Sequence, residues 1–316
     1  MSSTSVKVLV GTKITDAMVS SSTIAEPAAG ETAWTSGGTY AIDVERLSTA
    51  VHGIYVCVQA HTGRTARPEA DPNYWLFKQP SAKWAALDSS ITTQSRAVTP
   101  LTYVFRPGFI NAISLRGLDG AAATVTYKDG PGGATVFTGT YDLQEPPLDW
   151  YDWAFGRIRP LSKLVISDLL PYPDAEVTVT ITAATGVEVG VAMINFGDLR
   201  LLLSDSAQWG GAEQGATVEP VSYSYIDTDK YGNTRIVDGA STAGMDIEVP
   251  MPGDVADYVA ATLEELLGKP ATWIATDAPG HTSLNVHGLG SGRVTYLSPG
   301  VAKLSLKVKG IVNATV

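Results

Sequence analysis

Short segments of alternating apolar residues, separated by turn sequences, constrain the fold of this chain more than any other feature. Between residues 82 and 196 they include LTYVF, AAATVTY, ATVFTGTYDL, AEVTVTITAA and VEVGVAMINFG. The turn sequences PG, DG, PGG and PYPD lie between them, and each predicted strand is roughly five to eight residues long. No helical period fits the segment. Residues 82–196 are therefore predicted to form a β-sandwich.

The composition extends this prediction to the whole chain. Its 316 residues are enough for about two or three domains. The 31 glycines and 18 prolines favour short strands and tight turns. Charged residues make up 17% of the chain, against about 25% in an average soluble domain. A surface with so few charges suits a subunit that is buried in an assembly. The glycine and proline content therefore predicts a mainly β protein.

The charge pattern argues against two classes of partner. The formal net charge is −10, and lysines and arginines form no cluster, whereas nucleic-acid binding needs a basic patch to neutralise phosphates. Anionic membrane surfaces are disfavoured for the same reason. The start of the chain, MSSTSVKVLVGTK, does not have the pattern of a cleavable signal. No apolar run reaches the roughly 18 residues that a membrane span requires, so we expect no nucleic-acid partner and no membrane insertion.

Residues 34–81 are predicted to form a small aromatic β module. Strands are expected at 41–44 and 53–60, with a long loop over 61–73. A unit of this size cannot fold unless its few large side chains do most of the packing, so most of its aromatic rings should be structural. Cys57 is the single cysteine and lies in the apolar run IYVCVQA. We expect it to be a buried, inert thiol.

The motifs W-x5-Y, I-Y-x-C-x-x-A-H-T-G and D-P-x-Y-W in this module resemble those of small chitin-binding-type carbohydrate modules. The resemblance implies that Trp34, Tyr55 and Trp75 are framework aromatics of the core. It leaves Tyr40 and Tyr74 as candidates for an exposed platform, on which a sugar ring could stack. A docking surface for a neighbouring subunit is the alternative use of these two tyrosines.

The two ends of the chain complete the expected domain division. Residues 1–33 are interpreted as an opening strand, 6–15, and a linker, and residues 197–316 as an α+β barrel or sheet with one helix. Asp254 is the expected N-cap of that helix, and Gly268 its C′ residue. Its predicted apolar stripe is Val255, Tyr258, Val259, Thr262, Leu263, Leu266 and Leu267. Strands are expected at 219–227, 234–237, 244–249, 272–276, 282–286, 293–297 and 302–308, with GLGSG at 288–292 as a turn.

A second aromatic cluster, DWYDWAFGR, spans residues 149–157. Its carboxylates Asp149 and Asp152 could form a glycosidase pair, but an interface loop or a corner between strands is the preferred interpretation. Trp150 and Trp153 then become a candidate aromatic binding surface. The chain has no G-x-S-x-G motif, P-loop or dinucleotide fingerprint. We therefore expect no catalytic residues and no cofactor, and we interpret the protein as a non-enzyme.

Two further patterns could suggest metal ions. The spacing Asp227-x-Asp229-x-x-Gly232 resembles part of a calcium loop, but position 12 is Asp238 instead of a glutamate. A hairpin turn is the preferred interpretation. His281 and His287 are too far apart for a helical metal pair, so no metal site is expected.

The order of the segments carries a second resemblance. The aromatic module runs into KWAALDSSITTQS, and then come F-x-P-G-x-I-x-A-I-S-L, the DWYDW segment and SYSYIDTDKYGNTRIVDG. Residues 82–196 resemble a galactose-binding-like jelly roll. Most of the chain resembles virion structural proteins of tailed bacteriophages, and its last 120 residues resemble ring-forming tail proteins.

This resemblance implies a structural subunit of a phage tail, at the tail tip, hub or neck. The subunit would be synthesised in the host cytoplasm, be located in the virion, and form a homo-oligomeric ring with other tail proteins as partners. Its carbohydrate-binding-like domains would project outward. The alternative is a module that recognises a glycan on the host surface.

Overall fold

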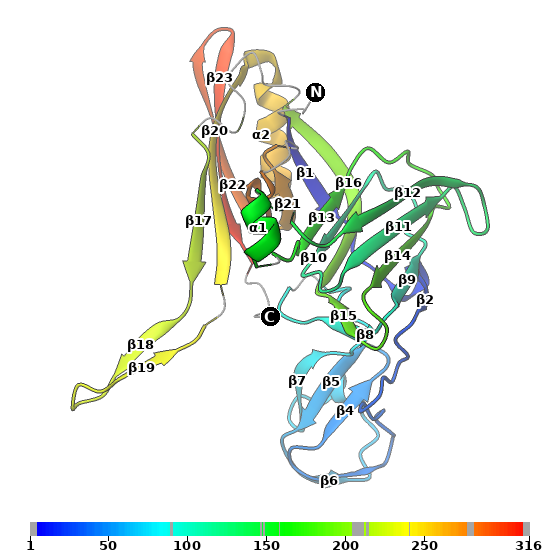
Figure 1. The fold of residues 1–316 in the computed structure, drawn as a ribbon. Helices are drawn as coiled ribbons and strands as arrows, with labels where there is room; N and C mark the ends of the chain where they lie inside the picture. The colour runs from blue at the N-terminus through cyan, green and yellow to red at the C-terminus, as the bar shows by residue number, and fades with distance from the viewer. Residues whose placement is uncertain are drawn as a thin grey trace.

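The structure is a computed structural model, and the mainly β fold class expected from the sequence is confirmed, with 50% of residues in strands and 10% in helices. Figure 1 shows a sandwich, a small module below it, and a curled sheet with one long helix. The structure describes residues 5–311 except 89–90, 146, 148, 158, 204–211, 213–214, 240 and 277–280.

The β-sandwich is built from two sheets that share one core. One sheet has the order β12-β11-β14-β9-β2, and the other side is formed by β13-β10-β16 together with the pair β15-β8. Strand β14 shows why these sequences form half-buried strands, because Val177, Val179 and Ile181 are buried while the threonines between them face outward. The strands are β8 Ser95–Val98, β9 Leu101–Phe105, β10 Ala112–Arg116, β11 Ala122–Lys128, β12 Thr135–Asp142, β13 Lys163–Ile166, β14 Glu176–Thr182, β15 Glu188–Val191 and β16 Met193–Leu203.

One nine-stranded sheet joins the sandwich to the C-terminal region. Its order is β13-β10-β16-β1-β21-β22-β23-β20-β17. The five C-terminal strands in it are β17 Thr217–Ser222, β20 Ser241–Pro252, β21 Pro270–Ile274, β22 Asn285–Ser298 and β23 Val301–Gly310. Strand β1, Val6–Gly11, lies between β16 and β21 and pairs antiparallel with both. The buried side chains of Val6 and Val8 belong to the C-terminal core. The opening strand expected from the sequence is thus a central strand of the sheet, although it ends at Gly11.

The expected linker over residues 16–33 contains regular structure. A 3₁₀ turn, η1, covers Asp16–Met18, and strand β2, Val19–Ser22, pairs with β9 at the edge of the five-stranded sheet. An edge strand needs hydrogen bonds on one side only. The polar run of serines can therefore serve as a strand, and the linker prediction is wrong for these residues.

The aromatic module contains the three-stranded sheet β4-β5-β7 and the pair β3-β6. The strand expected at 53–60 is confirmed as β5, although it ends at Cys57. The strand expected at 41–44 is wrong, because Asp43 has a positive φ of 66° and these residues turn the chain between β3 and β4. The strands are β3 Thr39–Tyr40, β4 Glu45–Ser48, β5 Gly53–Cys57, β6 His61–Thr62 and β7 Trp75–Pro80, with the 3₁₀ turn η2 at Pro68–Ala70.

The C-terminal region packs helix α2, Ala256–Glu265, against β22 and β16. Gly268 has a φ of +73°, as expected of a C′ glycine. The N-cap is Val255, because Asp254 lies in the preceding 3₁₀ turn η4, Gly253–Val255. The strands are β17 Thr217–Ser222, β18 Tyr225–Thr228, β19 Thr234–Val237, β20 Ser241–Pro252, β21 Pro270–Ile274, β22 Asn285–Ser298 and β23 Val301–Gly310, and the 3₁₀ turn η5 covers Thr282–Leu284.

The predicted apolar stripe of α2 is only partly correct. Val259, Thr262 and Leu266 are buried, whereas Tyr258 and Leu267 are exposed. The face of the helix that packs against the sheet is narrower than predicted. Leu267 is 69% exposed because it lies after the end of the helix at Glu265.

The turn predicted at GLGSG, residues 288–292, is wrong. These residues lie inside β22, one continuous strand that pairs with β21 and β23. A Cβ at Gly290 would collide with the indole of Trp273, and one at Gly292 would lie 2.6 Å from the side chain of Leu263. Gly290 therefore makes room for a tryptophan of the neighbouring strand β21 and Gly292 for a leucine of helix α2, and neither glycine turns the chain.

Candidate functional site

Trp75 and Tyr40 form the core of the aromatic module, and their rings meet edge to face at 5.1 Å. Tyr40 is only 4% exposed, which corrects its expected place on a surface platform. Its hydroxyl accepts the Thr35 N–H at 2.9 Å and donates to the Thr35 carbonyl at 2.8 Å. Because these bonds satisfy the hydroxyl, burial costs little and adds a large ring to a small core. Trp34 and Tyr55 are half-buried and pack against this core.

Tyr74 is half-buried, and one face of its ring is covered by Arg64. The guanidinium of Arg64 lies 3.8 Å from the centre of its ring, and His61 meets the ring edge to face at 5.2 Å. Arg64 is held there because its Nε donates to the buried carboxylate of Asp71 at 2.7 Å. The two tyrosines therefore do not form the exposed platform predicted for this module, because Tyr40 is buried and Arg64 covers one face of Tyr74.

Cys57 is fully buried, as expected. Burial raises the pKa of its thiol, and the Sγ lies 3.1 Å from the Gln59 carbonyl oxygen. Burial thus keeps the sulfur protonated and unreactive.

Residues 150–155 form the short helix α1, Trp150–Phe155, where an interface loop or a corner between strands was expected. Asp149 caps it, because its side chain accepts the Asp152 N–H at 2.8 Å. The Asp152 carboxylate forms an ion pair with Arg159 at 3.3 Å. Both carboxylates thus stabilise the local fold.

Helix α1 presents an exposed aromatic patch. Trp150 is 74% and Trp153 is 78% exposed, so the surface predicted for these two residues is present. Tyr151 and Phe155, which the sequence analysis did not single out, are exposed beside them. We refer to these four residues as the α1 patch.

Strands β18 and β19 form a two-stranded hairpin that projects away from the body of the protein (Figure 1). We refer to residues 225–237 as the arm. Its turn is the predicted one, because the Asp229 carboxylate accepts the N–H groups of Tyr231 and Asn233 at 2.8 and 2.9 Å. Several apolar side chains of the arm are exposed. Tyr225, Ile226, Tyr231 and Ile236 are between 60 and 78% exposed.

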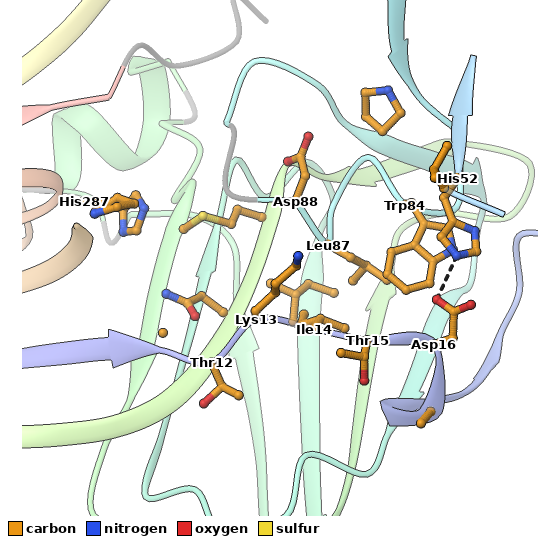
Figure 2. A pocket seen from close by; sticks show the side chains of 18 of the residues that line it. Thr12, Lys13, Ile14, Thr15, Asp16, His52, Trp84, Leu87, Asp88 and His287 are labelled. Atoms are coloured by element: carbon orange, nitrogen blue, oxygen red, sulfur yellow. Dashed lines mark hydrogen bonds and ion pairs between the residues drawn. The ribbon is translucent and has the colours of Figure 1, made fainter. Parts of the chain in front are cut away.

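A cleft of about 950 Å³ lies where the aromatic module, the sandwich and the C-terminal region meet. Figure 2 shows Asp16, His52 and Trp84 at one end and His287 at the other. The His52 ring lies between two carboxylates, with Nε2 2.7 Å from Asp16 and Nδ1 3.0 Å from Glu26. Trp84 stacks on the same ring at 4.0 Å and donates its indole N–H to Glu26 at 3.2 Å.

Sequence reasoning did not find this cleft. Its residues come from segments far apart in the chain, and no local motif joins them. The network of His52 and its carboxylates fixes the module against the sandwich. Among the residues that the structure describes, no group of three or more histidine, cysteine or acidic side chains could hold a metal ion. No helix in the described ranges is long and apolar enough to span a membrane.

Comparisons with known proteins include two solved structures that are distantly similar to this chain. No protein-family model matches the chain, and no curated protein matches it. The F5/8 type C domain of a Bacteroides fragilis protein aligns with a TM-score of 0.26 and 15% identity, over 37% of this chain and 80% of its own. Chitosan-binding module 1 of a chitosanase/glucanase from Paenibacillus sp. IK-5 aligns with a TM-score of 0.25 and 13% identity, over 37% and 84%. These scores are too low to carry a conclusion about function.

Proposed function

We propose that this protein is a non-catalytic structural subunit of a bacteriophage tail and that it assembles into a homo-oligomeric ring. The tail context rests on the resemblance of the ordered sequence segments to virion proteins. The observation that carries the assembly role is the arm, an exposed apolar hairpin without a core of its own. Other tail proteins would be its partners in the virion.

The arm needs a partner for physical reasons. An isolated two-stranded hairpin is marginally stable in water, and contiguous exposed apolar surface marks interaction sites. Ile226 and Ile236 lie directly opposite each other in the register of β18 and β19. The pair therefore forms one apolar spot on one face, which a neighbouring subunit could cover. If the arm of each copy contacts the next copy head to tail, the copies form a closed ring when the rotations between successive copies add up to a full turn.

The test compares two double variants of the arm by mass photometry at micromolar concentration. Ile226→Ser with Ile236→Ser removes the apolar pair. Asp227→Ser with Arg235→Ser is the matched control, because these residues form the adjacent register pair on the opposite face. We expect multimers for the wild type and the control, and monomers with unchanged circular dichroism for the isoleucine variant. A wild type that stays monomeric, with and without tail partners, would refute the proposal.

A second candidate function is recognition of a glycan on the host surface. The α1 patch favours it, because two exposed indole rings can stack on the C–H faces of sugars. Glycan-array binding should be lost in Trp150→Ala with Trp153→Ala and kept in Tyr74→Ala, whose ring face is already covered by Arg64. Binding that depends on Tyr74, or no binding to any glycan, would eliminate this candidate.

A further inference from the structure

A cluster of basic side chains is buried where the sandwich meets the C-terminal region. Arg116 of β10 is 3% exposed, and His287 of β22 is 5% exposed. Lys163 of β13 is the register partner of Arg116 and is partly buried. In the nine-stranded sheet, β16, β1 and β21 lie between β10 and β22. The sheet curls back toward itself (Figure 1), and this curl brings Arg116 and Lys163 to the same cavity as His287.

The neutral groups around the cluster satisfy only part of it. Arg116 donates through Nη2 to the Asn285 side-chain oxygen, and Lys163 donates through Nζ to the Asn285 carbonyl at 3.4 Å. The Nε of Arg116 and the Nε2 of His287 are buried and have no hydrogen-bond partner among the described residues. Buried polar atoms are rarely left unpaired without a ligand or water to bind.

The charges of the cluster are also uncompensated. Burial lowers the pKa of Arg116 to about 9. Burial, and then the charge of Arg116, lower the pKa of Lys163 to about 8. Both groups still carry a positive charge at neutral pH, and within the described ranges no carboxylate forms an ion pair with either. Burying a charge without a counter-charge is costly. A bound anion would remove that cost, whereas a water molecule would not.

Arg116, Lys163 and His287 line one small cavity together with Thr242 and Ile311. Its volume is about 10 Å³, close to the ~10–15 Å³ that one water-sized occupant requires. The cavity therefore suits a monatomic ion better than phosphate or sulfate.

We propose that this cavity is a binding site for a single halide-type anion, chloride in solution. The Arg116 Nε–H, the Lys163 ammonium and the His287 Nε2–H supply the donors. The imidazole can present that proton, because the Thr272 hydroxyl lies 3.0 Å from Nδ1 and can donate to it. Burial, and then the charge of Arg116, lower the pKa of His287 to about 3, so the ring stays neutral and keeps one N–H. The anion joins β10 and β13 of the sandwich to β22 and so stabilises the curl of the sheet.

The test is thermal unfolding of the full chain at constant ionic strength. Sodium gluconate is replaced stepwise by sodium chloride, bromide or sulfate. Chloride and bromide should raise the melting temperature, by about 5 °C when the halide is about 100-fold above its dissociation constant. Sulfate should have no saturable effect. Equal shifts with sulfate, or no shift with any anion, would overturn the proposal.

Three variants and a diffraction experiment locate the effect. Arg116→Met should abolish the chloride dependence. Arg293→Met, which changes an exposed arginine on β22, the strand of His287, should keep it. Lys163→Met removes one donor and should weaken the dependence, so it supplies the test if Arg116→Met does not fold. In crystals soaked in bromide, an anomalous peak should lie beside the Arg116 guanidinium. Bromide sites confined to the surface would contradict the assignment.

Discussion

The substitution Gly290→Ala tests whether the glycines of β22 make room for the core. The added Cβ would collide with the Trp273 indole, which is 1% exposed. The ring cannot move away freely, because its N–H donates to the Gly288 carbonyl at 3.2 Å. Overpacking costs about 1–3 kcal/mol, and losing that hydrogen bond adds about 1 kcal/mol. We expect the free energy of unfolding to fall by about 2–4 kcal/mol.

Urea unfolding followed by circular dichroism measures this cost, and two glycines in the same hairpin serve as controls. A Cβ at Gly300 meets no atom within 4 Å, so Gly300→Ala should change the free energy of unfolding by less than about 0.5 kcal/mol. Gly292→Ala should lie between the two, because the end of the flexible Leu263 side chain can yield. A cost below about 0.5 kcal/mol for Gly290→Ala would refute the close-packing explanation and favour a turn-like role.

Three further predictions concern local features. Asp149→Ala should destabilise helix α1 by about 1 kcal/mol and speed amide hydrogen exchange in it. Asp149→Asn should do neither, because an asparagine side chain can still cap the helix. Equal exchange rates in the two variants would contradict the capping role. Cys57 should react with a thiol reagent only after unfolding in urea, and fast labelling of the native protein would disprove its burial. Since the pKa of His287 is about 3 when folded and about 6.5 when unfolded, only the unfolded chain gains this proton as the pH falls below about 6.5. Urea unfolding at several pH values between about 6.5 and 3 should show stability falling by up to about 1.4 kcal/mol per pH unit, and His287→Gln should fall less steeply.

Local patterns predicted the elements whose cause is local. The alternation in β14, the Asp229 turn and the C′ position of Gly268 each depend on neighbouring residues, and the structure contains all three. The exposure of Trp150 and Trp153 agrees with the aromatic binding surface predicted from the DWYDWAFGR cluster.

The remaining features depend on contacts between distant segments. Gly290 looks like a turn residue until Trp273 is placed against it. Tyr40 looks like a surface residue until Thr35 is seen to satisfy its hydroxyl. Arg116 and His287 come together only because the sheet curls, and no residue spacing in the sequence predicts that curl.

The oligomeric state of the full chain tests the proposed assembly role most directly. Mass photometry at micromolar concentration should show multimers of one defined size, and the double substitution of Ile226 and Ile236 by serine should convert them to monomers that remain folded. Monomers for the wild type, or multimers that persist when these two isoleucines are replaced, would contradict the proposed role of the arm.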